Sequence, residues 1–144
     1  MLPGTGRSIV LPADYSPPDV GCIDVNLGSV LMEKFGRIGF SSINQIRSMN
    51  YHLLDLNIQQ IWNGCNGLPI DIVSELSLDA TPRNHYFMNM SIPKPPAKRR
   101  YVCVQRYFEE KYNISLNQPH SPLFRDQGGR MYPVEAVWLR IRLF

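Results

Sequence analysis

The stretch RYFEEKYNISL, from Arg106 to Leu116, decides how the second half of the chain is interpreted. Apolar and aromatic residues recur at every fourth position up to Tyr112, which predicts a helix over residues 102–112. Tyr107 and Lys111 are also four apart, so they share a neighbouring face of that helix. NISL then alternates and predicts a short strand. Tyr107, Lys111 and Tyr112 either complete an amphipathic helix or hold a ligand together.

Away from this helix, the hydrophobic pattern predicts short strands and helices in mixed order. In chain order we expect a strand over 22–27, a helix ending at Gly36, a helical run over 41–64 that Asn57 can divide, strands over 68–76 and 85–92 with methionines filling a core, a loop with a turn at 128–129, and a strand over 133–144. This order predicts a small α+β domain shaped like a barrel. Residues 1–21 are rich in proline and predict an extended arm or linker, so the domain spans 22–144.

The composition fits one globular domain, with 144 residues of which 44% are hydrophobic and 19% charged. The apolar runs are too short to span a bilayer, and the first residues lack the pattern of a secretory signal. We therefore expect a soluble, cytoplasmic protein with no membrane partner, and a nuclear location stays open. Three widely spaced cysteines argue against a disulfide framework or a zinc site and predict buried thiols.

Charge is distributed unevenly between the two parts of the chain. Residues 1–82 contain four Lys/Arg against eight Asp/Glu, a net charge of −4, whereas residues 83–144 contain eleven against four, a net charge of +7. The basic part also holds five of the seven tyrosines, and it includes the proline-rich segment PKPPAKRR at 93–100. Basic groups among aromatic rings are typical of single-strand nucleic-acid sites, although a solvated basic surface has the same composition.

The sequence shows no catalytic constellation. The three histidines lack the spacing of metal ligands, and the adjacent Glu109 and Glu110 would point about 100° apart on a helix. We therefore expect a binding module, not an enzyme, with no cofactor and no metal.

Four motifs in a fixed order carry a resemblance to a known family. They are Tyr107-Phe108, the run from Lys111 to Leu116, the Pro119–Pro122 loop and the run from Tyr132 to Glu135. In this order they resemble the PAZ domain of Argonaute, Piwi and Dicer proteins. The likeness is closest over residues 103–139 and extends over about 22–140. The start, CIDVNLGSV, resembles the linker before the domain in Argonautes, which makes Dicer the weaker match.

The resemblance implies an OB-like β-barrel with N-terminal helices and a small inserted helix-and-hairpin lobe. It also implies capture of the 3′ end of a small guide RNA, or of a two-nucleotide 3′ overhang, in RNA silencing. The partner would then be the single-stranded 3′ end of the RNA, and the chain would be part of a larger Argonaute-like protein. RNA cleavage in Argonautes belongs to a different domain.

By matching position, the resemblance assigns the RNA 3′-end site to seven residues. Tyr107, Lys111 and Tyr112 would converge on one phosphate. Tyr86 would be a second phosphate donor with Arg83 or His85 beside it, Tyr132 would wall the pocket, and Tyr101 is the candidate to stack on the terminal base. The hairpin between Tyr86 and Tyr107 is shorter than is usual in the family, and Ser74-Glu75 stand where the family often has a histidine.

Two other functions remain open at this point. One is a degenerate PAZ-like protein-interaction domain that does not bind RNA. The other is a nonspecific single-strand binder on an OB-like barrel.

Overall fold

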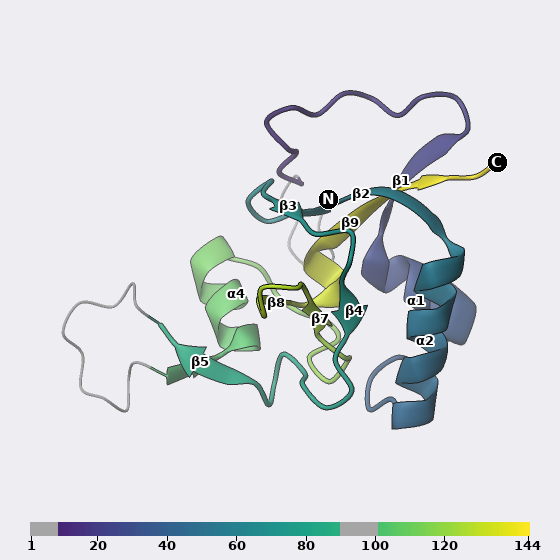
Figure 1. Cartoon of the computed structure of the whole chain (residues 1–144). Coiled ribbons are helices and arrows are strands. Elements are labelled where there is room, and N and C mark those ends of the chain that lie inside the picture. The colour runs from purple at the N-terminus through teal and green to yellow at the C-terminus, as the bar shows by residue number, and fades with distance from the viewer. Residues whose placement is uncertain (1–8, 90–100) are drawn as a thin grey trace.

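A computed structural model of the chain describes residues 9–89 and 101–144 (Figure 1). The elements are β1 (Cys22–Asn26), α1 (Leu27–Phe35), α2 (Ile43–Asp55), β2 (Asn57–Asn63), β3 (Pro69–Ile70), β4 (Glu75–Leu76), β5 (Tyr86–Met88), β6 (Tyr101–Cys103), α4 (Val104–Tyr112), β7 (Phe124–Arg125), β8 (Met131–Tyr132), the 3₁₀ turn η1 (Val134–Ala136) and β9 (Val137–Arg142). Helices α1 and α2 lie on one side of the molecule, and α4 lies with β5 on the other.

The described strands form three antiparallel sheets. Their strand orders are β1-β9-β2-β3, β4-β7-β8 and β5-β6. The predicted α+β class is therefore confirmed. In the described ranges none of the three sheets closes on itself, so the structure does not confirm the OB-like barrel.

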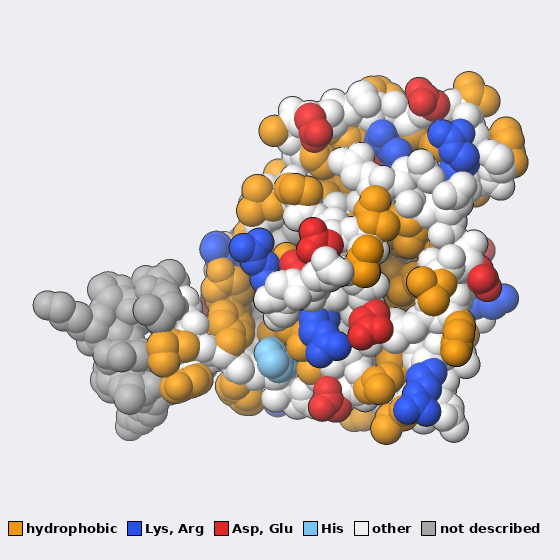
Figure 2. Space-filling view, in the orientation of Figure 1, with side chains coloured by type: hydrophobic (Ala, Val, Ile, Leu, Met, Phe, Trp, Pro, Cys, Tyr) orange, Lys and Arg blue, Asp and Glu red, His pale blue; other side chains and the backbone are white. Residues whose placement is uncertain are grey.

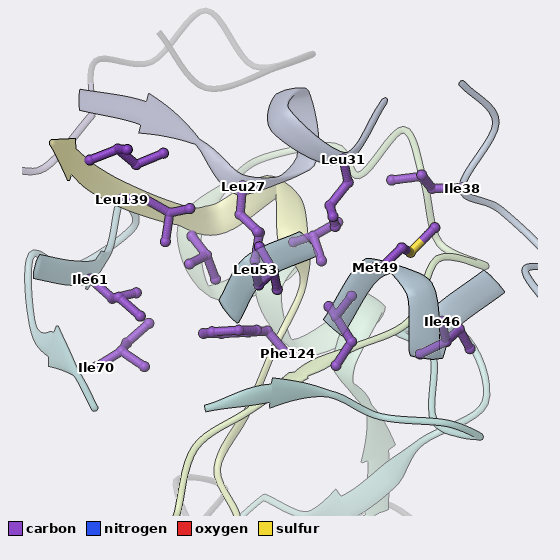
Figure 3. Close-up of a cluster of buried hydrophobic side chains, with 14 residues drawn as sticks. Leu27, Leu31, Ile38, Ile46, Met49, Leu53, Ile61, Ile70, Phe124 and Leu139 are labelled. Carbon is purple, nitrogen blue, oxygen red and sulfur yellow. The ribbon is translucent and has the colours of Figure 1, made fainter. Parts of the chain in front are cut away.

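The main core lies between the four-stranded sheet and the first two helices. Val137, Leu139 and Ile141 point from β9 into it, as their alternation predicts. Leu31 of α1 and Met49 of α2 are fully buried opposite them (Figure 3). A second cluster forms around Val104 and Phe108 of α4. The fold thus has one large core beneath the sheet and a smaller one that fixes α4.

Local capping explains where the first two helices begin and end. The side chain of Asn26 accepts a hydrogen bond from Ser29 N at the start of α1, and Ser42 accepts one from Gln45 N at the start of α2. Gly36 has φ of 73° after α1, a conformation that glycine adopts without steric cost.

The second half of the expected helical run over 41–64 was predicted wrongly. Helix α2 ends at Asp55, and residues 57–63 form β2 between β9 and β3. A β-bulge between Ile58 and Gln60 lets Ile58 and Ile61 face the same core although they are three residues apart. Ile61 and Trp62 continue the helical spacing of Leu53 and Leu54, which is why the periodicity misled.

The strand expected for NISL was also wrong, because residues 114–116 are irregular. Asn113 has φ of 54°, and the N–H of Leu116 donates to the Glu109 carboxylate at 2.9 Å. The Glu109 side chain thus accepts from a backbone N–H that would donate to a neighbouring strand if this segment were part of a sheet.

Four further expectations need adjustment. The strand over 68–76 divides into β3 and β4, which belong to different sheets. Met88 is exposed, so it does not fill a core, and only Cys65 of the three cysteines is buried. The loop after Pro119 contains β7 before its expected turn. Met90, Ile92 and the basic segment 93–100 lie outside the described residues.

Residues 9–20 contain no helix or strand, yet they lie against the four-stranded sheet. Arg140 holds them by donating to the Asp24 carboxylate at 2.8 and 3.1 Å and to Ser16 O at 2.7 Å. The Tyr15 hydroxyl donates to Asp24 at 2.8 Å, and its ring lies edge-on to Trp62. We refer to residues 9–20 as the arm.

Candidate functional site

Helix α4 places the three central candidates at the edge of the second core. Val104 and Phe108 are buried, and Asn113 in the left-handed conformation ends the helix. Tyr107 and Tyr112 are half-buried and Lys111 is exposed. The helix therefore anchors one face in the core and leaves these polar groups accessible.

Lys111 lies between the two tyrosine rings. Its Nζ donates to the Tyr107 Oη at 2.7 Å and lies 5.1 Å from the centre of that ring and 5.7 Å from the centre of the Tyr112 ring. The hydrogen bond to Tyr107 raises the pKa of Lys111, so the amine is charged at neutral pH. The structure thus brings Tyr107, Lys111 and Tyr112 together, as a convergent site requires.

Tyr112 has a partner that the sequence did not reveal. Asn66, in the turn between β2 and β3, donates from Nδ2 to the Tyr112 hydroxyl at 3.3 Å and accepts from Leu68 N. Burial raises the pKa of Tyr112, which keeps its hydroxyl protonated. An Asn-Gly pair signals a turn, but no local pattern shows that the turn reaches a helix 46 residues later.

The direction of these hydrogen bonds determines which ligands the cluster favours. Because the Tyr107 oxygen accepts from Lys111, its own hydrogen points to a different acceptor. In the part of the chain that the structure describes, no carboxylate forms an ion pair with Lys111. A charged amine beside protonated phenols presents donors, which suits an anion rich in acceptors such as a phosphate.

Tyr86 and Tyr101 lie elsewhere, on the β5–β6 hairpin. The hairpin pairs Tyr86 with Cys103 and Met88 with Tyr101, so the two tyrosines share one face and are 62% and 55% exposed. Phe87 points to the other face and packs edge-on against Tyr107, with the ring centres 5.1 Å apart. The hairpin therefore presents Tyr86 and Tyr101 away from the face that contacts Tyr107.

Arg83 and Tyr132 are also separate from the Lys111 cluster in their printed contacts. The Arg83 guanidinium reaches Gln105 Oε1 at 3.5 Å. The Tyr132 hydroxyl donates to Asp126 at 3.4 Å while its ring packs against both cores, and burial raises its pKa. Packing thus fixes the Tyr132 ring in place, but its hydroxyl already donates to Asp126.

Glu135, the last residue of the fourth motif, fixes the loop that follows α4. Its buried carboxylate accepts the N–H groups of Asn117 at 2.8 Å and Gln118 at 2.7 Å. Burial raises the pKa of Glu135, and these two N–H donors act in the opposite direction. Among the described residues this buried carboxylate is held by backbone N–H groups alone, which makes it a structural anchor.

A hollow of about 730 Å³ opens between α2 and the β4–β7 pair, and the three α4 residues do not line it. Core side chains such as Phe124 and Leu139 form part of its lining, and the exposed Leu54, Ile72 and Val73 border it. Figure 2 shows hydrophobic side chains gathered over this part of the face. The hollow is mostly apolar, although Glu75, Arg125 and Asp126 also line it, in contrast to the cluster of Tyr107, Lys111 and Tyr112.

Within residues 9–89 and 101–144, no group of three or more potential ligands is arranged to hold a metal ion. None of the helices in these ranges combines the length and apolar character that crossing a membrane needs. Neither a protein-family model nor a curated protein matches the sequence.

Proposed function

We propose that this chain is a small-RNA binding module with a PAZ-like fold, which captures the 3′ end or two-nucleotide 3′ overhang of a guide RNA. The order of the motifs around α4 supports a PAZ-like fold. An OB-like barrel is part of this proposal. On this proposal the chain is part of a larger Argonaute-like protein and acts as a binding module, not as an enzyme.

One observation carries the proposal: Lys111 lies between two phenol rings and has no carboxylate partner among the described residues. Tyr107 and Lys111 can donate to the same phosphate, and bonds from a charged donor are about twice as strong as neutral ones. A free RNA end suits such a site because its unstacked bases and 2′-hydroxyl groups are accessible.

The test compares a short RNA duplex bearing a two-nucleotide 3′ overhang with the blunt duplex, at two salt concentrations. Overhang preference is the expected result. The Tyr107→Phe and Tyr112→Phe variants should each weaken overhang binding about fivefold, since a lost hydrogen bond contributes about 1 kcal/mol. Unchanged binding by both variants would show that the site lies elsewhere. Strong salt dependence without end preference would instead support a nonspecific single-strand binder.

The apolar hollow between α2 and the β4–β7 pair favours the alternative of a protein-interaction domain. Exposed apolar patches of this kind often mark contact surfaces. This alternative predicts that neither RNA binds at either salt concentration, so the same titration separates the two functions.

A further inference from the structure

Phe40, in the loop between α1 and α2, has an unusual backbone for its residue type. Its φ is 58°, and Asn113 is the only other described non-glycine residue with a positive φ. Asparagine tolerates this region, whereas an aromatic residue is an outlier there. Burial does not compensate for the strain, because Phe40 is 70% exposed.

A second loop holds Phe40 in place. Its N–H donates to His120 O at 3.0 Å, and its ring stacks on the His120 imidazole with centres 4.1 Å apart and planes 21° apart. The His120 loop is itself fixed by the bonds of Asn117 and Gln118 to Glu135. One face of the Phe40 ring is thus covered by His120, and the exposure of the residue leaves ring surface open to a further planar group.

Beside this stack lies a hollow of about 270 Å³, which Phe40, His120, Arg83 and Asp79 help to line. The backbone N–H of Arg83 donates to Pro119 O at 3.0 Å. The only described hydrogen bond of its guanidinium is the long one to Gln105, at 3.5 Å. Asp79 accepts from the Ser77 hydroxyl at 3.0 Å through one of its two carboxylate oxygens. The hollow is smaller than a site for a drug-sized ligand, so it suits a single ring system.

We propose that Phe40 is a stacking platform for one nucleobase of single-stranded RNA, with Arg83 donating to the adjacent phosphate. Asp79 then accepts from an amino group of the base, which favours adenine, cytosine or guanine over uracil. A nucleotide fits this site because its base can stack on the open face of the Phe40 ring while its phosphate accepts from the nearby guanidinium. The proposal rests on the proposed function in taking RNA as ligand, but it needs no RNA end.

The experiment uses the complete chain and a short circular single-stranded RNA, which has no 3′ end. Phe40→Gly and Phe40→Asn remove the ring but suit the left-handed backbone, so neither should lower the melting temperature. Both should weaken binding of the circular RNA about tenfold, within the range measured for loss of one base–aromatic stack. Phe40→Tyr retains the ring and should bind as the wild type does.

A circle of cytidines should also bind more tightly than a circle of uridines, and Asp79→Asn should reduce the difference. The proposal is wrong if the wild type does not bind circular RNA, or if Phe40→Gly binds it unchanged. A Lys111 variant that loses overhang preference but still binds the circle separates the two sites. Equally, a Phe40 effect without any overhang preference would retain this inference and remove the proposed 3′-end function.

Discussion

The molecule places a cation against tyrosine in two regions, with opposite consequences. Under the arm, Arg140 lies 5.1 Å from the centre of the Tyr15 ring, and on α4, Lys111 lies at the same distance from the Tyr107 ring. Arg140 is also bound bidentately by Asp24, whereas Lys111 has only phenol partners among its described contacts. The presence or absence of a carboxylate therefore distinguishes a structural clamp from a group that can accept an anionic ligand.

The largest expected effect comes from breaking the clamp. Arg140 and Asp24 form a mostly buried pair, with side chains 12% and 16% exposed. Arg140→Met should lower the free energy of unfolding by about 3 kcal/mol, because it leaves the Asp24 carboxylate buried without its counter-ion. Urea denaturation measures the change.

The matched control is Arg106→Met. Arg106 and Glu110 also meet at 2.8 Å, but their side chains are 71% and 65% exposed. Losing this exposed pair should change the free energy of unfolding far less than losing the buried one, because water screens the exposed charges. Equal losses in the two variants would show that burial does not distinguish the pairs, and the comparison would fail.

The next effect concerns the other region, where Lys111→Met should change binding and not stability. We expect affinity for the 3′ overhang to fall about tenfold, which corresponds to about 1.4 kcal/mol. The slope of log affinity against log salt should fall by about 0.7, as expected for one lost phosphate contact with a single strand. Fluorescence anisotropy titrations at several salt concentrations measure both.

Lys34→Met is the control for this variant, since Lys34 is an exposed lysine on α1. It removes the same charge from the chain at a different place. If both lysine variants weaken RNA binding equally, the effect is one of net charge, and Lys111 has no special role.

The smallest effect tests the Glu135 carboxylate, which forms no ion pair within the described residues. Because burial raises the pKa of Glu135 in the folded chain, the folded state binds the proton more tightly than the unfolded state does. The stability that the carboxyl contributes is therefore greatest below its ordinary pKa of 4.5 and declines as pH rises through the raised value. The wild type should lose stability relative to Glu135→Gln between acidic and neutral pH. If the wild type instead gained stability relative to Glu135→Gln as pH rises, the assignment would be contradicted.

The sequence predicted the parts of the fold whose signals are local. Gly36 ends α1, Ser42 caps the start of α2, and β9 alternates without interruption. Strand β2 was missed because its pattern depends on a bulge and on pairing with β9, which is remote in the chain. Residues 113–116 were misassigned because the Glu109 carboxylate accepts the Leu116 N–H, and Glu135 accepts those of the next two residues, Asn117 and Gln118.

The candidate site shows the same division between local and remote signals. Helical spacing predicted that Tyr107 and Lys111 would meet, and they do. Strand alternation predicted that Tyr86 and Phe87 would face opposite ways, but not which of them would face the helix, because that depends on how the hairpin packs. The bond of Asn66 to Tyr112 joins a turn to a helix, and the stack of Phe40 on His120 joins two loops, so spacing along the chain predicts neither contact.

The way the arm crosses the sheet gives the protein an internal optical reporter. Its only two tryptophans, Trp62 and Trp138, are cross-strand neighbours on the side of the sheet where the arm lies. The arm backbone passes so close to Gly67 that an added methyl group would lie 2.5 Å from Leu11 O. Gly67→Ala should therefore lift the arm, and intrinsic fluorescence would record the detachment without any introduced label.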